Sequence, residues 1–439
     1  MPDNATSTNP AVQAQLDRLW SLSPGADVLG LDRITQLLDR IGNPHLSLPP
    51  IFHVAGTNGK GSTCAFLRAA LEADGKSVHV FTSPHLVRFN ERIRINGALI
   101  SDALLAKYLE RILDLAGDIG ASFFEVTTAA AFLAFADHPA DAAIIEVGLG
   151  GRLDATNILP APAVCGIAQL GIDHQSFLGD TLAEIAAEKA GIAKPGVPLI
   201  TSRYAAVVAS IIATAAETAE APYFPMGSDW DAAVYRDRLH YRDGMGKIEL
   251  PLPRLPGPHQ PMNAALAIAM LRHQDAVPVS EAALKAAPLW AQWPARLQRL
   301  DHGPLTALLS RGNALWLDGG HNEAAGEMLA KFLDGLSPQE KPVHLIVGML
   351  SNKDVAAFLQ PMRGKISHIY SLPVPGHDHH RTDRFEAIAR EWGIVSSAHD
   401  NVADALAAVA ASGDSAPILI AGSLYLAGDV LLRNDQLPD

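Results

Sequence analysis

Cysteine is almost absent from this chain, which has only Cys64 and Cys165 among its 439 residues. This scarcity excludes a disulfide scaffold and favours a reducing compartment. The segment MPDNATSTNP has neither a basic region nor an apolar core, so we expect no secretory signal there. The longest apolar stretch, residues 416–432, contains Ser423 and Asp429 and falls short of a membrane span. We therefore expect a cytoplasmic protein with no membrane partner.

Positive charge is also in deficit, because 34 Lys and Arg stand against 47 Asp and Glu, for a formal net charge of −13. This balance argues against general affinity for nucleic acid or anionic membranes, but a local anion site depends only on the groups that line it. Charged residues make up only 18% and hydrophobic residues 48%, which excludes a mainly disordered chain. At roughly 150 residues per domain, the length predicts two or three domains.

The order of the apolar runs predicts an α/β fold. Short β-like runs alternate with longer helical stretches, as in βαβ units with a mostly parallel sheet. Residues 223–259 instead predict a small antiparallel excursion, and the domain boundary is expected within residues 294–299, which gives domains 1–295 and 296–439. We expect strands at 51–55, 77–81, 142–147, 163–168, 315–318, 343–347, 366–371 and 418–421, and helices at 60–73, 183–194 and 262–272.

The clearest chemical signal is the segment HVAGTNGKGS at residues 53–62. A predicted strand runs into a glycine-rich turn, and Lys60, Gly61 and Ser62 open the predicted helix. Backbone N–H groups of such a turn close around phosphate oxygens, the helix N-terminus favours an anion, and the lysine adds a point charge. Gly56 and Gly59 are closer together than in the usual Walker A motif. The alternative is a strand–helix turn that binds nothing; a dinucleotide site is disfavoured because no G-x-G-x-x-G occurs here.

Polar residues also follow three further predicted strands. Ser83 follows the strand at 77–81, Glu146 lies at the end of the strand at 142–147, and His174 follows the strand at 163–168. Since the carboxyl ends of parallel strands line the ligand crevice of an open α/β sheet, these three side chains are expected near the phosphate turn. They suit Mg²⁺ only in part, because that ion prefers oxygen. Alternatively, Ser83 caps a turn before Pro84 and His174 is an ordinary loop histidine.

Taken together, these segments resemble the folylpolyglutamate synthase/dihydrofolate synthase family of the Mur ligase superfamily. The segments that carry the resemblance, in the family's order, are HVAGTNGKGS, TSPHLVRFNERIRING, FFEVTTAAAF, EVGLGGRLDATN, GIDH, EKAGIAKPG, PMNAALA, WPARLQ, LDGGHN and GMLSNKD.

The resemblance implies a P-loop ATP-binding domain with a mostly parallel sheet, followed by a smaller Rossmann-like glutamate ligase domain. It implies that ATP phosphorylates a substrate carboxylate to an acyl phosphate, which an incoming amine attacks. Catalysis of that kind consists largely of positioning and charge neutralisation. Domain closure is expected to exclude water, because an acyl phosphate hydrolyses.

The resemblance also assigns the nucleotide site residue by residue. Asn263 would contact adenine, Arg296 a phosphate, and Asp318 the ribose or a phosphate, while His321 would act near the nucleotide or the glutamate. Lys60 would neutralise developing charge. The ATP phosphates would be held by Thr57, Asn58, Gly59, Lys60, Gly61 and Ser62.

For the metal, the resemblance implies that Ser83 and Glu146 hold one Mg²⁺ and His174 a second. Lys189, in EKAG, matches a lysine that is carbamylated in the superfamily (N6-carboxylysine). A carbamate turns an ammonium into a two-oxygen anion, which suits a metal site and a catalytic role. The alternative for Lys189 is an ordinary surface charge beside Glu188, since most helical lysines are solvated.

For the pteroate substrate, the resemblance points to three short segments. Phe123 and Phe124 would offer ring contacts, although both also read as core aromatics. Asp154 resembles the aspartate of bifunctional enzymes that accept dihydropteroate, which favours dual activity. The residues concerned are Leu29, Gly30, Leu31, Ser122, Phe123, Phe124, Glu125, Leu153, Asp154 and Ala155.

Two places in the second half of the chain need separate comment. The family often has alanine where LDGGHN has Gly320. The cluster of His377, His379 and His380 is read as surface rather than as a metal site, because adjacent histidines splay apart.

The expected function is ATP-dependent addition of L-glutamate to dihydropteroate and to reduced folates by a monomer with ATP and Mg²⁺. Alternatives are a folylpolyglutamate synthase without the first activity and a different Mur-type amide ligase. A P-loop phosphotransferase or NTPase switch would tolerate loss of Lys189. A non-catalytic nucleotide-binding module is disfavoured by five residues that occur together: Lys60, Ser83, Glu146, His174 and Arg296.

Overall fold

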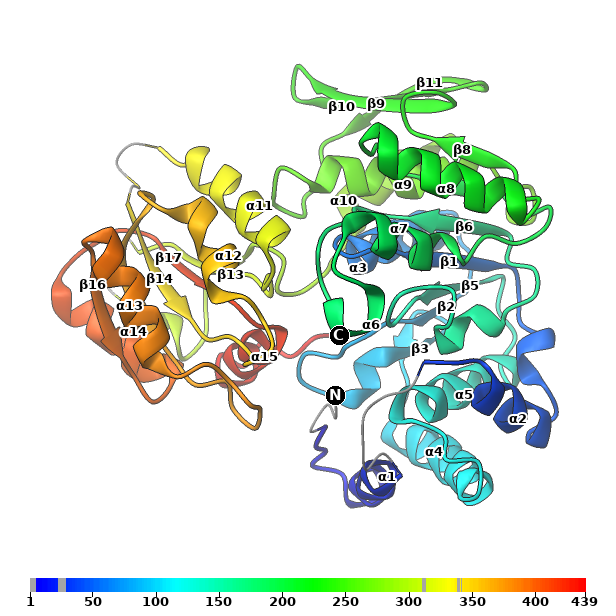
Figure 1. Cartoon of the computed structure of the whole chain (residues 1–439), viewed down its shortest axis with the longest axis horizontal. Helices are drawn as coiled ribbons and strands as arrows, with labels where there is room; N and C mark the ends of the chain where they lie inside the picture. Colours follow the sequence, from blue (N-terminus) through cyan, green and yellow to red (C-terminus); the bar gives the residue numbers. More distant parts are fainter. Residues whose placement is uncertain (1–4, 23–28, 310–312, 338–339, 341) are drawn as a thin grey trace. The chain divides into compact units, whose positions relative to one another are not determined.

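The computed structural model describes residues 5–22, 29–309, 313–337, 340 and 342–439 (Figure 1). The chain divides into two compact units. The first comprises Met1–Arg254, Gln260–Gln292 and Asp439, and the second comprises Leu255–His259 and Trp293–Pro438. In the part of the chain that the structure describes, no helix combines the length and apolar character that crossing a membrane requires.

An eight-stranded sheet forms the centre of the first unit. Its strands are β1 (Ile51–Ala55), β2 (Val78–Phe81), β3 (Ile93–Ile95), β4 (Ala98–Leu99), β5 (Ala142–Glu146), β6 (Val164–Ile167), β7 (Leu199–Thr201) and β8 (Tyr223–Pro225). They lie in the order β4-β3-β2-β5-β1-β6-β7-β8. All pairs are parallel except those that β3 makes with β2 and β4. The carboxyl ends of β1, β2, β5 and β6 therefore meet at one edge of the sheet.

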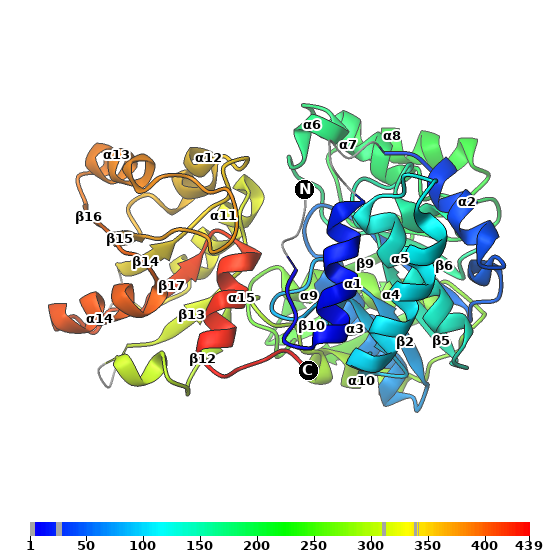
Figure 2. The ribbon, with the colours of Figure 1, turned by 90° about the horizontal axis from the view of Figure 1, so that it is seen from below.

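Helices cover both faces of this sheet (Figure 2). They are α1 (Pro10–Ser21), α2 (Asp32–Arg40), α3 (Lys60–Ala73), α4 (Asp102–Ala116), α5 (Phe123–Ala136), α6 (Gln175–Leu178), α7 (Leu182–Ala190), α8 (Ala206–Thr218), α9 (Gln260–Arg272) and α10 (Glu281–Trp290), with short 3₁₀ turns at Pro44–Leu46, Phe89–Arg92 and Ala155–Ile158. Ile51 packs in the core with α1, α2, α4 and α5, and Ala55 packs in the core with α7 and α8. Since residues 51 and 55 share a face of β1, these helices cover one face. α3, α9 and α10 pack together on the other.

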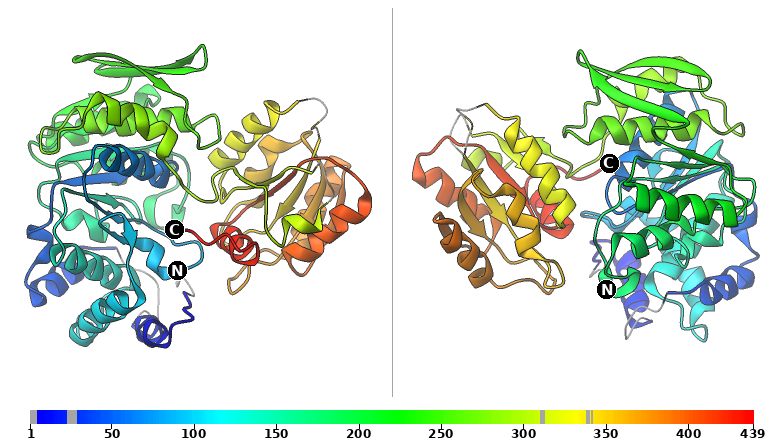
Figure 3. Two further views of the ribbon diagram at one scale, coloured as in Figure 1. Left: turned by 180° about the vertical axis from the view of Figure 1, so that it is seen from behind. Right: turned by 45° about the horizontal axis from the view of Figure 1, so that its top comes forward.

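A small antiparallel sheet, as predicted, packs on α9 and α10 (Figure 3). Its strands are β9 (Trp230–Tyr235), β10 (Arg238–Asp243) and β11 (Gly246–Pro251). Asp243, whose side chain is fully buried, accepts two hydrogen bonds from Arg272 at the end of α9, at 2.6 and 2.7 Å. Tyr241 donates a third, at 3.0 Å. This ion pair ties the small sheet to the helix that begins at Gln260.

The second unit is built on a six-stranded sheet in the order β12-β13-β17-β14-β15-β16, parallel except at β12. Its apolar core includes Leu329, Leu345, Phe358 and Phe385. The elements are β12 (Gln298–Leu300), β13 (Leu315–Leu317), α11 (Glu323–Asp334), β14 (Val343–Val347), α12 (Val355–Leu359), β15 (Ile366–Ser371), α13 (Thr382–Trp392), β16 (Val395–Ala398), α14 (Val402–Ser412), β17 (Ile418–Ala421) and α15 (Leu424–Arg433), with 3₁₀ turns at Thr306–Leu308 and Gln360–Met362. A mostly parallel sheet followed by a second, smaller α/β unit confirms the predicted fold class.

Three predicted elements need correction. The helix predicted at 183–194 ends at Ala190, because its last carbonyls bond to the glycine-rich loop after β5: Arg152 N–H donates to Glu188 O at 2.8 Å. The helix predicted at 262–272 starts at Gln260, with Pro261 in its first turn, where a missing N–H costs nothing. Residues 223–225 form β8 of the parallel sheet and do not belong to the antiparallel excursion.

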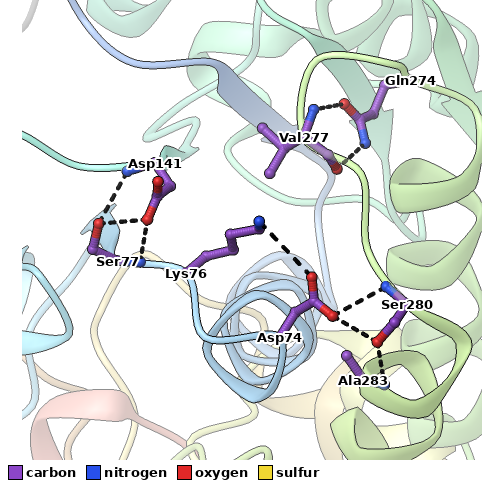
Figure 4. A network of polar contacts seen from close by, with 8 residues as sticks. All are labelled: Asp74, Lys76, Ser77, Asp141, Gln274, Val277, Ser280 and Ala283. Carbon is purple, nitrogen blue, oxygen red and sulfur yellow. Dashed lines mark hydrogen bonds and ion pairs between the residues drawn. The ribbon is translucent and has the colours of Figure 1, made fainter.

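Polar bonds close the opposite edge of the main sheet, at the amino ends of β2 and β5 (Figure 4). Asp74, at the end of α3, accepts bonds from Ser280 N–H (3.1 Å) and Oγ–H (2.6 Å), and Ser280 also caps α10. Asp141 accepts bonds from Ser77 N–H (2.7 Å) and Oγ–H (2.8 Å). These bonds hold the pKa of both carboxyls below its usual value. They fasten α3 and the strands beside it at the edge away from the phosphate turn.

Candidate active site

The phosphate turn lies between β1, which ends at Ala55, and α3, which begins at Lys60. Gly59 caps the helix at a φ of +86°, and a Cβ there would lie 2.6 Å from Asn263 Oδ1. Only glycine meets both conditions. The N–H groups of the first helical turn have no partner within the helix. The structure therefore presents an anion-binding helix N-terminus where the sequence predicts one.

Some of the predicted hydrogen-bond donors of the turn are already bonded to carbonyl oxygens of the protein. The N–H groups of Thr57 and Asn58 both donate to Gln169 O, at 2.9 and 3.1 Å. Lys60 Nζ donates to the carbonyls of Gly56 (3.1 Å) and Thr57 (3.4 Å). The donors at the start of α3, from Lys60 to Ser62, are therefore those best placed for phosphate.

Glu146 is the charge partner of this turn. Its buried carboxylate ends β5, lies 4.0 Å from Lys60 Nζ through Oε1, and accepts a bond from Ser83 N–H at 3.3 Å through Oε2. Ser83 follows β2, the strand next to β5. The structure thus brings together Lys60, Ser83 and Glu146 from three neighbouring strand ends. A hydroxyl and a carboxylate supply the hard oxygen donors that Mg²⁺ prefers, so this pair fits the ion.

His174 has a different environment. It is exposed, has a left-handed φ of +53°, and precedes the short helix α6, with its N–H donating to Asp173 Oδ1 at 2.8 Å. Among the described residues, no group of three or more His, Cys, Asp or Glu side chains is arranged to hold a metal ion. A metal role for His174 stays a prediction.

Lys189 is buried, with 4% of its surface exposed, which removes the surface-charge alternative. Burial, together with the nearby Lys60 ammonium, lowers its pKa to about 7, although Asp173 and Asp154 act in the opposite direction. The amine of Lys189 is therefore largely uncharged at slightly alkaline pH, which is the form that reacts with carbon dioxide. This property fits the carbamylation implied by the resemblance.

The loop after β5 packs directly on the helix that carries Lys189. A Cβ on Gly151 would lie 2.7 Å from Glu188 O and 2.8 Å from Lys189 O. The side chain of Arg152 forms an ion pair with Glu188 at 2.8 Å. Asn157 donates to the carbonyls of Arg152 and Gly191, each at 3.0 Å. The segments EVGLGGRLDATN and EKAG therefore form one unit.

Asp154, the predicted pteroate residue, lies buried within this loop. Its Oδ1 accepts from Thr156 N–H (3.0 Å) and Oγ–H (2.5 Å), and its Oδ2 accepts from Leu149 N–H (2.8 Å). Burial raises the pKa of Asp154, and these bonds oppose the rise. His53 Nε2 completes the network at 2.9 Å from Thr156 Oγ1. The bonds of Asp154 shape the loop, and contact with substrate stays a prediction.

The other pteroate candidates lie around the start of α5. Ser122 and Glu125 form a capping box, and Arg33 Nε, which the sequence did not single out, donates to Glu125 Oε2 at 3.0 Å. Phe123 is buried against Trp20 and Phe89 as a core aromatic. By contrast, Phe124 is partly exposed, and a Cβ on Gly148 would lie 2.3 Å from its ring. Of the two rings, Phe124 is the one that keeps some exposed surface, and its contact with a ligand stays a prediction.

The remaining members of the predicted pteroate set belong to two loops. Leu29, Gly30 and Leu31 are partly exposed and precede α2. Leu153 is partly exposed, and Ala155 is buried at the start of the turn that Asp154 caps.

In the second unit, Arg296, Asp318 and His321 form a separate cluster. Asp318 is buried and accepts bonds from Leu297 N–H (2.8 Å) and Gly320 N–H (2.7 Å). Burial raises the pKa of Asp318, while Arg296 and His321 oppose the rise. A Cβ on Gly320 would lie 2.8 Å from Ala325 Cβ. This crowding accounts for glycine at the position where the family often has alanine.

Gln260 was not predicted as a site residue, yet it lies just before the predicted PMNAALA helix and bonds to both Ser62 and Asn263. The sequence feature that could have identified Gln260 is its position three residues before Asn263, because this spacing puts both side chains on one side of a helix.

The comparisons with known proteins show which family the chain resembles. Residues 306–424 match the family described as "Mur ligase, glutamate ligase domain". The folylpolyglutamate synthase of Lacticaseibacillus casei is 34% identical over 91% of this chain and 92% of its own length. The dihydrofolate synthase/folylpolyglutamate synthase of Bacillus subtilis is 33% identical over 92% of this chain and 94% of its own length.

Solved structures of such synthases are also similar to this chain. Escherichia coli FolC in complex with DHPP and ADP superposes with a TM-score of 0.84, at 32% identity, over 98% of both chains. A bifunctional synthase from Yersinia pestis, complexed with AMPPNP and a Mn ion, superposes with a TM-score of 0.83, at 31% identity, over 97% of this chain and 99% of that one.

The close packing of Gly151 yields a prediction. Gly151→Ala is expected to destabilise the protein by about 1–3 kcal/mol, because the added methyl group overpacks against the backbone of Glu188 and Lys189. Unfolding in urea measures the change. Gly117→Ala is the matched control, since no heavy atom lies within 4 Å of its Cβ position, and its effect should stay within about 0.5 kcal/mol. Equal stabilities for the two variants would contradict the packing of this loop.

Proposed function

Because this chain belongs to the dihydrofolate synthase/folylpolyglutamate synthase family of Mur-type ligases, we propose that it uses ATP to join L-glutamate to dihydropteroate and to reduced folates. The observation that carries this function is the buried carboxylate of Glu146, held beside the Lys60 ammonium and the Ser83 N–H where three strands end. That arrangement suits a metal–nucleotide polyanion at the start of α3.

The chemistry follows from the poor reactivity of a carboxylate as an acyl donor. Transfer of the terminal phosphoryl group of ATP to the substrate carboxylate releases ADP and forms an acyl phosphate. The amine of glutamate then attacks the acyl carbon, the amide bond forms, and phosphate leaves with the former carboxylate oxygen. The protein contributes mainly position and charge to both steps.

Each candidate site residue of the first unit has a role in this proposal. The first turn of α3 binds the phosphates, Lys60 neutralises the charge that develops on them, and Asn263 contacts adenine. Ser83 and Glu146 hold the Mg²⁺, which supplies further charge neutralisation, and His174 contributes a second metal position. Lys189, as a carbamate, adds an anion to the metal site.

In the second half of the chain, Arg296 contacts a phosphate, Asp318 contacts the ribose or a phosphate, and His321 acts near the glutamate. We propose a functional division into residues 1–295, an ATP-binding domain that contains the phosphate turn, and residues 296–439, a glutamate ligase domain that also supplies Arg296 and Asp318 to the nucleotide. The match of residues 306–424 to a glutamate ligase domain supports it.

Phe124 and the loop around Asp154 are proposed to receive the pteroate, together with Leu29, Gly30, Leu31, Ser122, Glu125, Leu153 and Ala155. Asp154 matches the aspartate of the bifunctional enzymes, which supports both activities over polyglutamylation alone.

We also propose that the enzyme works in the cytoplasm as a monomer and does not bind nucleic acid. The two cysteines are free and buried, as suits a reducing compartment. The net charge of −13 disfavours nucleic acid.

A substrate matrix tests the function. Dihydropteroate and tetrahydrofolate are each supplied with and without glutamate, and ADP release is followed. We expect ADP release with either acceptor, and in both cases only with glutamate, because the amine is needed for turnover. Activity with tetrahydrofolate alone would mean a folylpolyglutamate synthase without the first activity. Activity only with a UDP-linked cell-wall precursor would mean a different Mur-type ligase.

Lys189 gives a second prediction. Lys189→Ala should lose most activity, and a short carboxylic acid such as acetate should restore part of it, because the acid replaces the two-oxygen anion of the carbamate. Lys60→Ala is the control, since it lacks a cation and added carboxylate cannot restore one. Steady-state ADP release measures both variants. Full activity of Lys189→Ala without acid would show that no carbamate is needed.

A further inference from the structure

Gln260 is a wholly buried polar residue that the proposed mechanism does not use. It opens α9 and has 0% of its surface exposed. Its side-chain Nε2 donates to Ser62 Oγ at 3.2 Å, and its Oε1 accepts a bond from Asn263 Nδ2 at 3.1 Å. Burying an amide is costly unless both of its ends are bonded. Both of these bonds go to side chains of the proposed ATP site.

The bond donated by Gln260 fixes the orientation of the Ser62 hydroxyl group. Because Gln260 donates to Ser62 Oγ, that oxygen acts as an acceptor on its buried side. Its own proton must then point elsewhere, and a phosphate bound at the first turn of α3 would supply an oxygen as the acceptor. Gln260 thereby orients a hydroxyl that would otherwise rotate freely.

The same bonds fix the amide of Asn263. Its NH₂ group donates to Gln260, so its Oδ1 points the other way, to 2.6 Å from where a Cβ on Gly59 would lie. An amide oxygen held in this direction accepts a bond from the exocyclic amino group of adenine. The corresponding position of guanine carries a carbonyl oxygen, which an amide oxygen repels. If the Asn263 amide alone rotated by half a turn, Gln260 Oε1 would lose its hydrogen-bond donor.

We propose that Gln260 is a positioning residue that sets both the purine preference of Asn263 and the phosphate-facing proton of Ser62. This inference rests on the proposed ATP site, and it links the base end of that site to the phosphate end through one side chain. It predicts that the choice of adenine over guanine depends on a residue that touches neither base.

The test measures binding of ADP and GDP by calorimetry, without folate or glutamate, so that it does not depend on the ligase reaction. The wild-type protein should prefer ADP. Gln260→Met, which keeps the length and loses the amide, should lower the ratio of ADP to GDP affinity by about tenfold, the value of one hydrogen bond. It should also weaken ADP binding. An unchanged ratio in Gln260→Met, or a wild-type protein without preference, would overturn the proposal.

Gln274→Met is the matched control. Gln274 is also a buried amide near the end of α9, but it bonds to backbone groups: to Leu271 O and to Val277, as Figure 4 shows. Its loss should lower the melting temperature and leave the ADP to GDP ratio unchanged. A similar fall of the ratio in Gln274→Met would show that the effect is general destabilisation, against the proposal.

Gln260→Glu keeps the proposal testable if Gln260→Met does not fold. Its carboxyl still accepts from Asn263, so the preference for ADP should persist, while the altered bond to Ser62 weakens binding of both nucleotides. Loss of the preference in Gln260→Glu would contradict the role of the acceptor oxygen. If these bindings behave as expected but the substrate matrix fails, the nucleotide site stands and the ligase assignment falls.

Discussion

Charge balance at the start of α3 is the constraint on which the site depends. A triphosphate brings several negative charges to a place where Glu146 is already buried. Lys60, 4.0 Å from that carboxylate, and the N–H groups of the first helical turn provide the compensation. The carboxylate in turn accepts a hydrogen bond from Ser83 N–H, and we propose that these two residues share a metal ion. Removal of any one of these groups leaves the others with unbalanced charge.

The loop after β5 extends this constraint to the rest of the site. Gly151 lets the loop lie on the backbone of α7, and the same loop carries Asp154. The helix end that holds Lys189 and the segment proposed to bind the pteroate are therefore packed against each other. This coupling suits a reaction in which the activated carboxylate must stay beside the nucleotide.

What could be predicted from sequence follows the range of the interactions. Gly59 and Lys60 are neighbours in a strand–turn–helix segment, so the phosphate turn and the start of α3 were predictable, as were most strands. The end of α7 was not, because Arg152, far upstream, takes the carbonyl that would have continued the helix. Gln260 was missed because only the fold brings Ser62 to it. Phe123 and Phe124 are adjacent in sequence, and only the packing of the fold makes Phe123 a core ring and leaves Phe124 partly exposed.

The central claim is that ATP is consumed to activate the carboxylate of the substrate. The most direct test uses dihydropteroate labelled with ¹⁸O in its carboxylate, together with ATP and glutamate, and mass analysis of the released phosphate. The account predicts that one labelled oxygen passes to phosphate in each turnover, because the acyl phosphate breaks at its carbon–oxygen bond. Unlabelled phosphate, released while the amide product still forms, would contradict it.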